Sequence, residues 1–389
     1  MQVSEMEQYR HDMLPKTGHD DLARQHFVRS FKEHLVKKIH GGNRVAYETR
    51  VKPAFEKAHR RPPGSRQEVR TVMTKDPHYR MFSALLRTSQ ELMWSSTQRP
   101  VERQIDELAD KARQSKGAGG SLTLDPTLEI PRYHTAVDIH CQPGGYHNEF
   151  VPDDVSAGAV YDRAVFIYAM GQMGPENADM GNSLIAWLKA NRPEFRPSRI
   201  LDLGCAVGHS TVPYARAWTD AEVHAIDVGA PMLRYAHARA ESLGVPVYFS
   251  QQNAEKTNFA DESFDLIVSH ILLHETSERA IHNIVRECHR LLRKGGLMIH
   301  AETPPYKGMD PFDAFMLDWD TRNNNEPFWC RSHEIDLNAL SAWGGFDPAK
   351  KFEVMSPSAH QVAETRRSHV FQGGDFGGGG VWFLYGCEK

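Results

Sequence analysis

The spacing of apolar residues divides the chain into a helical first part and an alternating second part. Up to about residue 115 the apolar positions recur at helical spacing, most clearly in 20–40, 81–94 and 101–112. Prolines punctuate this region, and Pro53 and Pro100 are expected to separate its helices. The pattern predicts an N-terminal helical extension.

From about residue 197, short apolar runs alternate with segments of helical periodicity. This alternation is typical of a parallel sheet covered by helices. The expected strands are 199–203, 222–227, 245–250, 265–270 and 297–301. The expected helices are 210–218, 231–242 and 281–292, the last with a glycine cap at Lys294-Gly295-Gly296.

A glycine-rich turn follows the first expected strand, in the stretch Arg199-Ile-Leu-Asp-Leu-Gly-Cys-Ala-Val-Gly-His209. Gly204 and Gly208 allow backbone angles that a side chain forbids and let the chain approach a ligand closely. The next strand ends at Asp227, 19 residues after Gly208, the spacing at which a nucleotide-binding unit places an acid on a ribose diol. The pattern Asp-x-Gly-x-x-x-Gly lacks the middle glycine of dinucleotide sites, and its acid favours a cationic ligand.

This pattern resembles motif I of the class I S-adenosylmethionine-dependent methyltransferases, with the ubiquinone/menaquinone-type branch as the nearest match. The resemblance covers roughly residues 197–305, including the acidic turn 261–265 and the Leu-Arg-Lys-Gly-Gly run 292–296. It implies an α/β fold with a Rossmann-like, seven-stranded sheet. Its last two strands, 351–356 and 381–386, should pair antiparallel through a mobile glycine-rich connection, 373–380.

The resemblance also implies S-adenosyl-L-methionine as cofactor and assigns residues to it. Asp202 and the backbone around Gly204 should face the amino-acid end, Asp227 the ribose hydroxyls, and Asn253 the adenine. Cys205 is expected to be a small apolar filler of the turn. The full predicted cofactor set is Asp202, Gly204, Cys205, Gly208, Asp227, Val228, Met232, Asn253, Ala254 and Ser269.

The methyl acceptor should lie beyond the carboxyl ends of the fourth and fifth strands, where open α/β sheets keep their ligands. His270 and His274 fall there, and a neutral histidine is a suitable general base for a hydroxyl or thiol. We select His274 as the base, with Glu275 as its orienting partner. The alternative is that both histidines are polar residues of a structural helix.

Composition shifts predict three regions. Residues 1–116 form the helical extension, either a lid or a dimerisation module, and a flexible linker at 116–121 ends it. Residues 122–195 connect to the catalytic domain, 196–389, which carries an insertion at about 304–332. The insertion either packs on the core or forms a wall of the substrate pocket, and its Pro304-Pro305-Tyr306 is interpreted as a turn.

The connecting region holds a polar, turn-rich loop at 138–147. His140, Cys141 and His147 offer metal ligands, but their spacing matches no zinc pattern, so no metal site is predicted. The loop is left as a lining of the substrate pocket or as plain structure. Further pocket candidates follow it at Tyr161, Arg163 and Tyr168.

Composition narrows the choice of partners and compartment. Hydrophobic residues make up 40% of the 389, and the net charge of −4 gives no general attraction to nucleic acid or an anionic membrane. No apolar run approaches the about 20 residues that cross a bilayer, and no signal-peptide core precedes the first helix. The five cysteines are scattered without a CxxC pair, which favours a reducing cytoplasm.

These observations predict a cytoplasmic methyltransferase, an enzyme that acts on O, N, S or C of a small molecule. Homodimerisation is one role considered for the helical extension. One alternative is a protein or RNA methyltransferase that docks through the basic segment 52–70, which is otherwise a solvated face. The other is a cofactor-binding scaffold or regulator without catalysis.

Overall fold

One mixed sheet forms the centre of the computed structural model, which describes residues 7–360 and 380–389. The strand order is β1-β4-β3-β2-β5-β6-β8-β7. Neighbours from β1 to β6 are parallel, whereas β8 is antiparallel to both β6 and β7, which confirms the predicted antiparallel end of the sheet. The strands are β1 (Ser121–Thr123), β2 (Arg199–Leu203), β3 (Glu222–Asp227), β4 (Tyr248–Gln251), β5 (Phe264–His270), β6 (Leu292–Glu302), β7 (Lys351–Pro357) and β8 (Val381–Glu388).

The eighth strand, β1, comes from the segment that the sequence predicts to be a flexible linker. Backbone N–H groups of Ala118 and Gly120 donate to the carboxylate of Glu241 at 2.7 and 3.0 Å, and Ser121 then pairs with Tyr248. A side chain at Gly120 would lie 2.6 Å from the carbonyl oxygen of Val247. Gly120 therefore serves close packing at the sheet edge, just before β1 begins.

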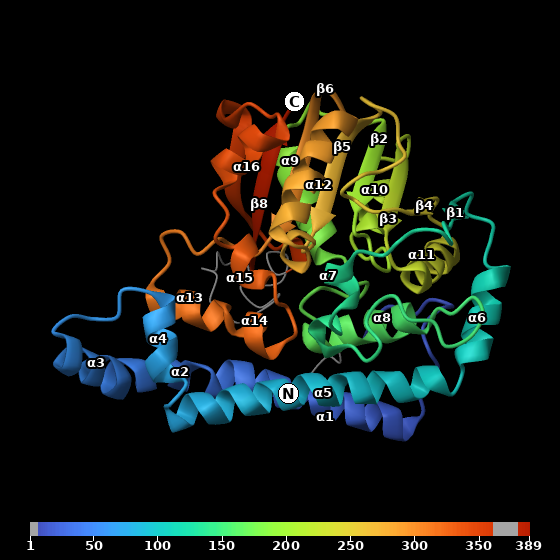
Figure 1. Ribbon diagram of the computed structural model, residues 1–389. Helices are drawn as coiled ribbons and strands as arrows, with labels where there is room; N and C mark the ends of the chain where they lie inside the picture. The colour runs from blue at the N-terminus through green and yellow to red at the C-terminus, as the bar shows by residue number, and fades with distance from the viewer. Residues whose placement is uncertain (1–6, 361–379) are drawn as a thin grey trace.

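Helices cover both faces of the sheet (Figure 1). Alternate residues of each central strand enter two apolar clusters, for example Ile200 and Val268 in one and Leu201 and Ile267 in the other. The covering helices are α9 (Asp179–Asn191), α10 (Thr211–Ala217), α11 (Ala230–Ser242), α12 (Glu278–Leu291) and α16 (Leu337–Gly344), whereas α8 (Ser156–Tyr168) packs against α11 and α5.

The structure differs from the sequence prediction in how α12 ends and in the place of Pro100. The predicted glycine cap is wrong, because α12 ends at Leu291 and Gly295 lies within β6, where the register with β5 shifts. Pro100 does not separate two helices but lies inside α5 (Pro77–Glu102), close to its end. A proline there removes few backbone hydrogen bonds, and its ring is buried. The predicted connection 373–379 lies outside the described residues.

The N-terminal helices form a separate layer at one end of the sheet, with α1 and α5 running side by side (Figure 1). Two π-helical turns, Leu35–Ile39 and Tyr47–Val51, interrupt this layer. Its helices are α1 (His19–His34), α2 (Gly41–Ala46), α3 (Lys52–His59), α4 (Arg66–Met73), α5 and α6 (Ile105–Gln114), followed by the short α7 (Arg132–Thr135).

Carboxylates neutralise much of the basic segment 52–70. Arg66 pairs with Glu334 and Arg70 with Asp318, both in the region of the insertion. The Arg66 guanidinium also lies over the ring of Tyr306, 4.6 Å from its centroid. The segment thus holds the helical layer against the insertion, whose helices are α13 (Pro311–Leu317), α14 (Trp319–Asn323) and α15 (Trp329–Ser332).

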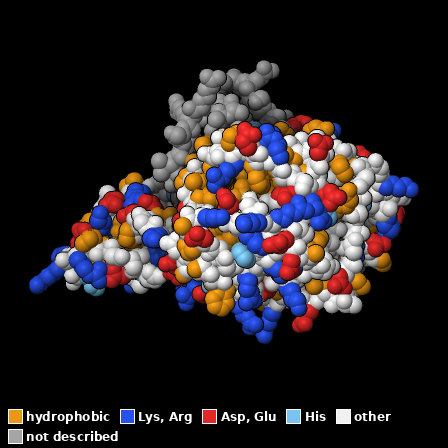
Figure 2. All heavy atoms as spheres, turned by 90° about the horizontal axis from the view of Figure 1, so that it is seen from above, with side chains coloured by type: hydrophobic (Ala, Val, Ile, Leu, Met, Phe, Trp, Pro, Cys, Tyr) orange, Lys and Arg blue, Asp and Glu red, His pale blue; other side chains and the backbone are white. Residues whose placement is uncertain are grey.

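The surface seen from above the sheet carries mixed charge. Lysines and arginines alternate with aspartates and glutamates over this face (Figure 2). A phosphate backbone would call for a continuous basic stripe. This face of the molecule offers none, in keeping with the net charge of −4.

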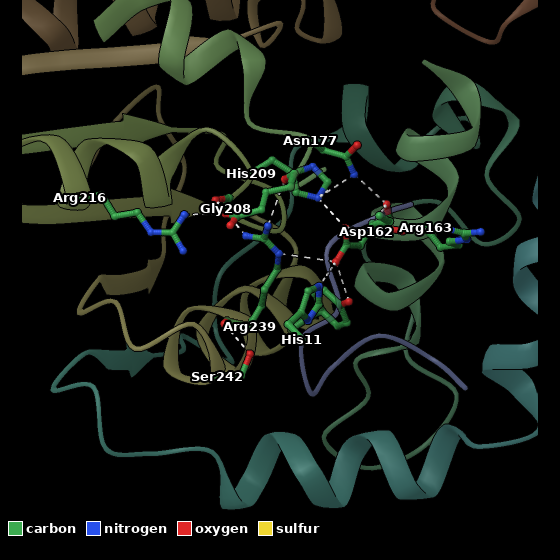
Figure 3. A network of polar contacts seen from close by, with 12 residues as sticks. His11, Asp162, Arg163, Asn177, Gly208, His209, Arg216, Arg239 and Ser242 are labelled. Atoms are coloured by element: carbon green, nitrogen blue, oxygen red, sulfur yellow. Dashed lines mark hydrogen bonds and ion pairs between the residues drawn. The ribbon is translucent and has the colours of Figure 1, made fainter. Parts of the chain in front are cut away.

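A buried carboxylate joins the N-terminal segment to the catalytic core (Figure 3). Asp162 of α8 accepts a hydrogen bond from Gln8 at 2.8 Å and lies 2.9 Å from the ring Nε2 of His11. On its other side are His209 Nε2 at 2.7 Å and the donating hydroxyl of Tyr235 at 2.8 Å. One side chain therefore connects segments that are far apart in the sequence.

Arg239 of α11 completes this network and supports the glycine-rich turn. Its Nε lies 3.6 Å from the Asp162 carboxylate, and its Nη1 donates to the carbonyl of Gly208 at 3.4 Å. The guanidinium is almost fully buried. Burial by itself would raise the pKa of Asp162, but His209 and His11 hold it well below its ordinary value.

We predict that Asp162→Asn lowers the free energy of unfolding by about 3–5 kcal/mol, because it leaves the buried Arg239 guanidinium without its acid. Since the folded pKa of Asp162 is depressed, its contribution is complete above the unfolded value near 4 and is lost as the pH falls below it. Urea unfolding at pH 7 and at pH 3–4 tests both statements. Asp153→Asn, at a half-exposed carboxylate, is the control and should change stability little. An equal loss in both variants would contradict the network's role.

Candidate active site

A cavity of about 800 Å³, open to solvent, lies at the carboxyl ends of the central strands. The loops after β2, β3, β4 and β5 line one side of it, and the connecting region before α8 lines the other. The lining residues are Tyr133, His134, Ile139, His140, Tyr146, Tyr161, Gly204, Ala206, Asp227, Val228, Asn253, Ala254, His270, Ile271, Leu272, Glu275, Thr276 and Ile284.

Five predicted cofactor residues line this cavity together: Gly204, Asp227, Val228, Asn253 and Ala254. Gly204 has φ +66°, and a Cβ there would lie 2.6 Å from Cδ1 of Leu272. Only glycine satisfies both conditions, so the turn can keep its shape and the cavity stays open beside the backbone.

The Asp227 carboxylate at the end of β3 is fixed by the backbone. One oxygen accepts from the N–H of Ala206 at 3.0 Å and the other from the N–H of Gly229 at 2.8 Å. Gly229 caps α11, so this carboxylate also fixes the start of that helix. Each carboxylate oxygen retains a further lone pair for a hydroxyl in the cavity.

The remaining predicted cofactor residues lie behind the cavity wall. Asp202 is buried, and its Oδ2 accepts from the hydroxyl of Thr211 at 2.6 Å. Gly208 closes the turn by donating its N–H to the carbonyl of Cys205 at 2.8 Å. Burial raises the pKa of the Cys205 thiol well above its ordinary value, so this side chain is a neutral filler as expected.

Met232 and Ser269, which also belong to the predicted cofactor set, do not line the cavity either. Met232 of α11 is buried in an apolar cluster that also contains Val207 of the glycine-rich turn and Val160 of α8. The Ser269 hydroxyl points between strands and lies 2.6 Å from Nδ1 of His300. Neither lines the cavity.

The three predicted catalytic residues separate in the structure. His270 and Glu275 line the cavity, whereas His274 is fully buried behind it. The ring of His270 lies between the hydroxyl of Tyr214, at 3.0 Å from Nε2, and Oδ1 of Asp202, at 3.4 Å from Nδ1. The prediction that His274 is the base in contact with the acceptor is therefore corrected. The His274 side chain is buried, and the side chain of the next residue, Glu275, lines the cavity instead.

Glu275 is paired with a histidine from the connecting region. Nε2 of His140 lies 2.6 Å from Oε1 of Glu275 and 3.4 Å from Oε1 of Glu326. Burial opposes protonation of His140, but these two carboxylates outweigh it and raise its pKa to about 9. His140 holds the pKa of Glu275 below its ordinary value although burial acts the other way.

The polar loop 138–147 supplies much of the cavity wall, which favours the substrate-lining alternative left open by the sequence. Tyr133 and Tyr146 were not identified from the sequence, although both lie in the aromatic, turn-rich region 132–147. Of the three later candidates, Tyr161 lines the cavity. Arg163 instead donates to Gln25 at 2.8 Å and to Gln8 at 3.1 Å, away from the site.

A second, mostly apolar cavity of about 520 Å³ adjoins the first and shares with it His140, Tyr161 and Ile271. Met93 and Trp94 of α5 line it together with Val165 and Tyr168 of α8. The helical layer thus contributes directly to the space beside the candidate site.

Comparison with known proteins agrees with this geometry. The family described as "Methyltransferase domain" matches residues 200–296. This part of the chain therefore matches a methyltransferase domain. The matched residues contain nearly all of β2, together with β3, β4, β5 and the start of β6, and the cavity lies at the ends of these strands. Strands β8 and β7 lie outside the match and extend the same sheet.

Curated relatives match over the same part of the chain. The malonyl-[acyl-carrier protein] O-methyltransferase of Methylococcus capsulatus is 37% identical over 123 residues, which are 30% of this chain and 41% of the relative. The ubiquinone biosynthesis O-methyltransferase of Methylobacterium sp. is 34% identical over 102 residues, 26% of this chain and 39% of the relative. The chain therefore spans less than half the length of either relative.

Among solved structures, the phosphoethanolamine N-methyltransferase 2 of Haemonchus contortus is 15% identical, with a TM-score of 0.41, and the match covers 59% of this chain and 58% of that one. The helical layer and the loop 138–147 lie outside the matched methyltransferase domain. The residues that face the acceptor must therefore be interpreted from their own geometry.

Proposed function

We propose that the chain is an S-adenosylmethionine-dependent methyltransferase that acts on a small-molecule acceptor. The observation that carries the proposal is the row of residues at the ends of β2, β3 and β4, where Gly204, Asp227 and Asn253 line one cavity. The matched methyltransferase domain contains all three. The relatives named above act on small or carrier-bound molecules, which supports a similar class of acceptor here.

The residues present fit the cofactor. Gly204 has the positive φ and the lack of a Cβ that a close approach needs, and Asp227 is a fixed carboxylate with lone pairs left over. Asp227 would hold the ribose hydroxyls, and Asn253 and Ala254 the adenine. When bound, the cofactor supplies an electrophilic methyl group on a sulfonium.

The acceptor would occupy the side of the cavity formed by the connecting region and its apolar continuation toward α5. Tyr146, Tyr161 and Ile271 exclude water there, and the His140–Glu275 pair offers a polar contact that orients the nucleophilic group. Holding two reactants in line in this way supplies roughly 7–11 kcal/mol of rate enhancement without any further chemical group.

The first test is calorimetric titration of the full chain with S-adenosylmethionine, its demethylated product and NAD. We expect micromolar binding of the first two and none of NAD, because the turn lacks the three-glycine pyrophosphate site. Asp227→Asn should weaken binding of both by about tenfold or more, since an amide cannot accept from the two backbone N–H groups and the ribose together.

Asp220→Asn, at an exposed carboxylate before β3, is the matched control and should bind normally. Circular dichroism and thermal unfolding confirm that both variants are folded. Unchanged affinity in Asp227→Asn would remove this residue from the site, and absence of any binding by the parent chain would favour the scaffold alternative.

A second prediction concerns the adjoining cavity. Val165→Phe fills space between α5 and α8 without touching the cofactor residues, so it should raise the KM for the acceptor severalfold and leave cofactor affinity unchanged. Val165→Ala, which enlarges the same cavity, is the control for a general loss of stability. Equal effects of Val165→Phe on cofactor and acceptor would show that the cavity does not select the acceptor.

We further propose a reducing, cytoplasmic setting. All five cysteines lie in the described ranges, and each is a free thiol. No helix within 7–360 or 380–389 is both long enough and apolar enough to cross a bilayer. Homodimerisation through the helical layer stays a prediction from the sequence.

A further inference from the structure

Four metal-ligating side chains meet beside the acceptor cavity: His140, His274, Glu275 and Glu326. One ligand atom of each lies within 4.8 Å of those of all the others. His274 and Glu326 are buried, and His140 and Glu275 line the cavity. Three separate segments supply them, namely the loop 138–147, the turn after β5 and the insertion.

The separations suit a common metal ion. His140 Nε2 lies 3.4 Å from Glu326 Oε1, and His274 Nε2 lies 3.6 Å from Glu275 Oε1 and 3.9 Å from Glu326 Oε2. Bonds of about 2.0–2.2 Å to one ion place its ligand atoms roughly 3–4 Å apart. The His140–Glu275 contact of 2.6 Å is shorter and would have to open.

A buried, unpartnered atom independently points to a ligand. Oε2 of Glu326 is inaccessible to solvent and has no hydrogen-bond partner within the described part of the chain. Its other oxygen accepts from the side-chain amide of Asn324 at 2.7 Å, which fixes the carboxylate. A carboxylate oxygen left without a partner at this depth is costly, and a cation removes that cost.

Groups behind the cluster hold its members in ligating orientations. Nδ1 of His274 lies 2.6 Å from the Glu302 carboxylate, which directs Nε2 toward the other three side chains. A carboxylate behind a histidine ligand is the usual support of a metal site. The Glu302 carboxylate is itself fixed, because its Oε1 accepts from the backbone N–H of Leu273 at 2.7 Å.

His140 is also held in place. Its backbone has φ +54°, which a residue with a side chain rarely adopts. The indole of Trp94 donates to its carbonyl at 2.7 Å and the amide of Gln90 at 3.1 Å, both from α5. The helical layer therefore maintains the conformation that brings this imidazole to Glu275 and Glu326.

We propose that His140, His274, Glu275 and Glu326 bind one divalent first-row transition-metal ion at the wall of the acceptor cavity. Two carboxylates and two neutral imidazoles balance a charge of +2, and the imidazoles favour zinc, manganese or iron over magnesium or calcium. Given the methyl-transfer function proposed above, the ion would orient an oxygen of the acceptor and favour its deprotonated form. This proposal departs from the prediction from the sequence that no metal binds.

The test uses tag-free full-length protein that has been treated with a chelator and dialysed. Titration with Zn²⁺, Mn²⁺ and Co²⁺ should show one tight equivalent for at least one ion, with Mg²⁺ at least 100-fold weaker. Bound Co²⁺ should give visible absorption bands that report nitrogen and oxygen ligation. These measurements need neither cofactor nor acceptor, so they remain valid if the proposed activity fails.

Glu326→Gln keeps the shape of the side chain and should weaken metal affinity by 10-fold or more. His140→Asn, which removes a ligand supplied by the loop 138–147, should weaken metal affinity to a similar extent. Glu278→Gln, at an exposed carboxylate three residues after Glu275, should bind as the parent does. Thermal unfolding verifies that each variant is folded. Absence of an equimolar site in the parent, or equal affinity in Glu326→Gln, would overturn the proposal and leave the cluster as an ion-pair network.

Discussion

The buried Asp162 carboxylate is the constraint on which the arrangement of this protein depends. It lies in α8, yet its partners come from the N-terminal segment, the turn after β2 and α11. A charge at this depth is tolerated only with its partners in place, so the network specifies how the preceding chain sits on the methyltransferase domain. The same network supports the carbonyl of Gly208 through Arg239 and thus the turn that borders the cofactor cavity.

The methyltransferase domain could be predicted from sequence because its signals are local. Strand β3 begins and ends at the predicted residues, and Gly204, Asp227 and Asn253 line one cavity as expected. Each of these roles is decided within a few residues of a strand end. Met232 and Ser269 do not line this cavity, because which face of a helix or strand points into it depends on neighbours that the local pattern does not contain.

The acceptor side could not be predicted in the same way, because long-range contacts build it. His140 and Glu275 are 135 residues apart, and their contact at 2.6 Å depends on how α5 holds the loop 138–147. Local spacing among His140, Cys141 and His147 showed no metal pattern, since only His140 faces the cluster. The edge strand β1 was missed for a similar reason, because Glu241, far along the chain, binds the backbone N–H groups of Ala118 and Gly120 just before it.

The helical layer, the loop 138–147 and the insertion act together through these contacts. Trp94 of α5 holds the carbonyl of His140, Asn325 donates to the carbonyl of Asp138 at 3.0 Å, and Arg66 joins α4 to the insertion through Glu334. A change of packing in the helical layer would therefore reach the His140–Glu275 pair without altering Asp227 or Asn253. The cavity residues at the strand ends and those of the loop 138–147 therefore rest on different segments, so one set can vary while the other is kept.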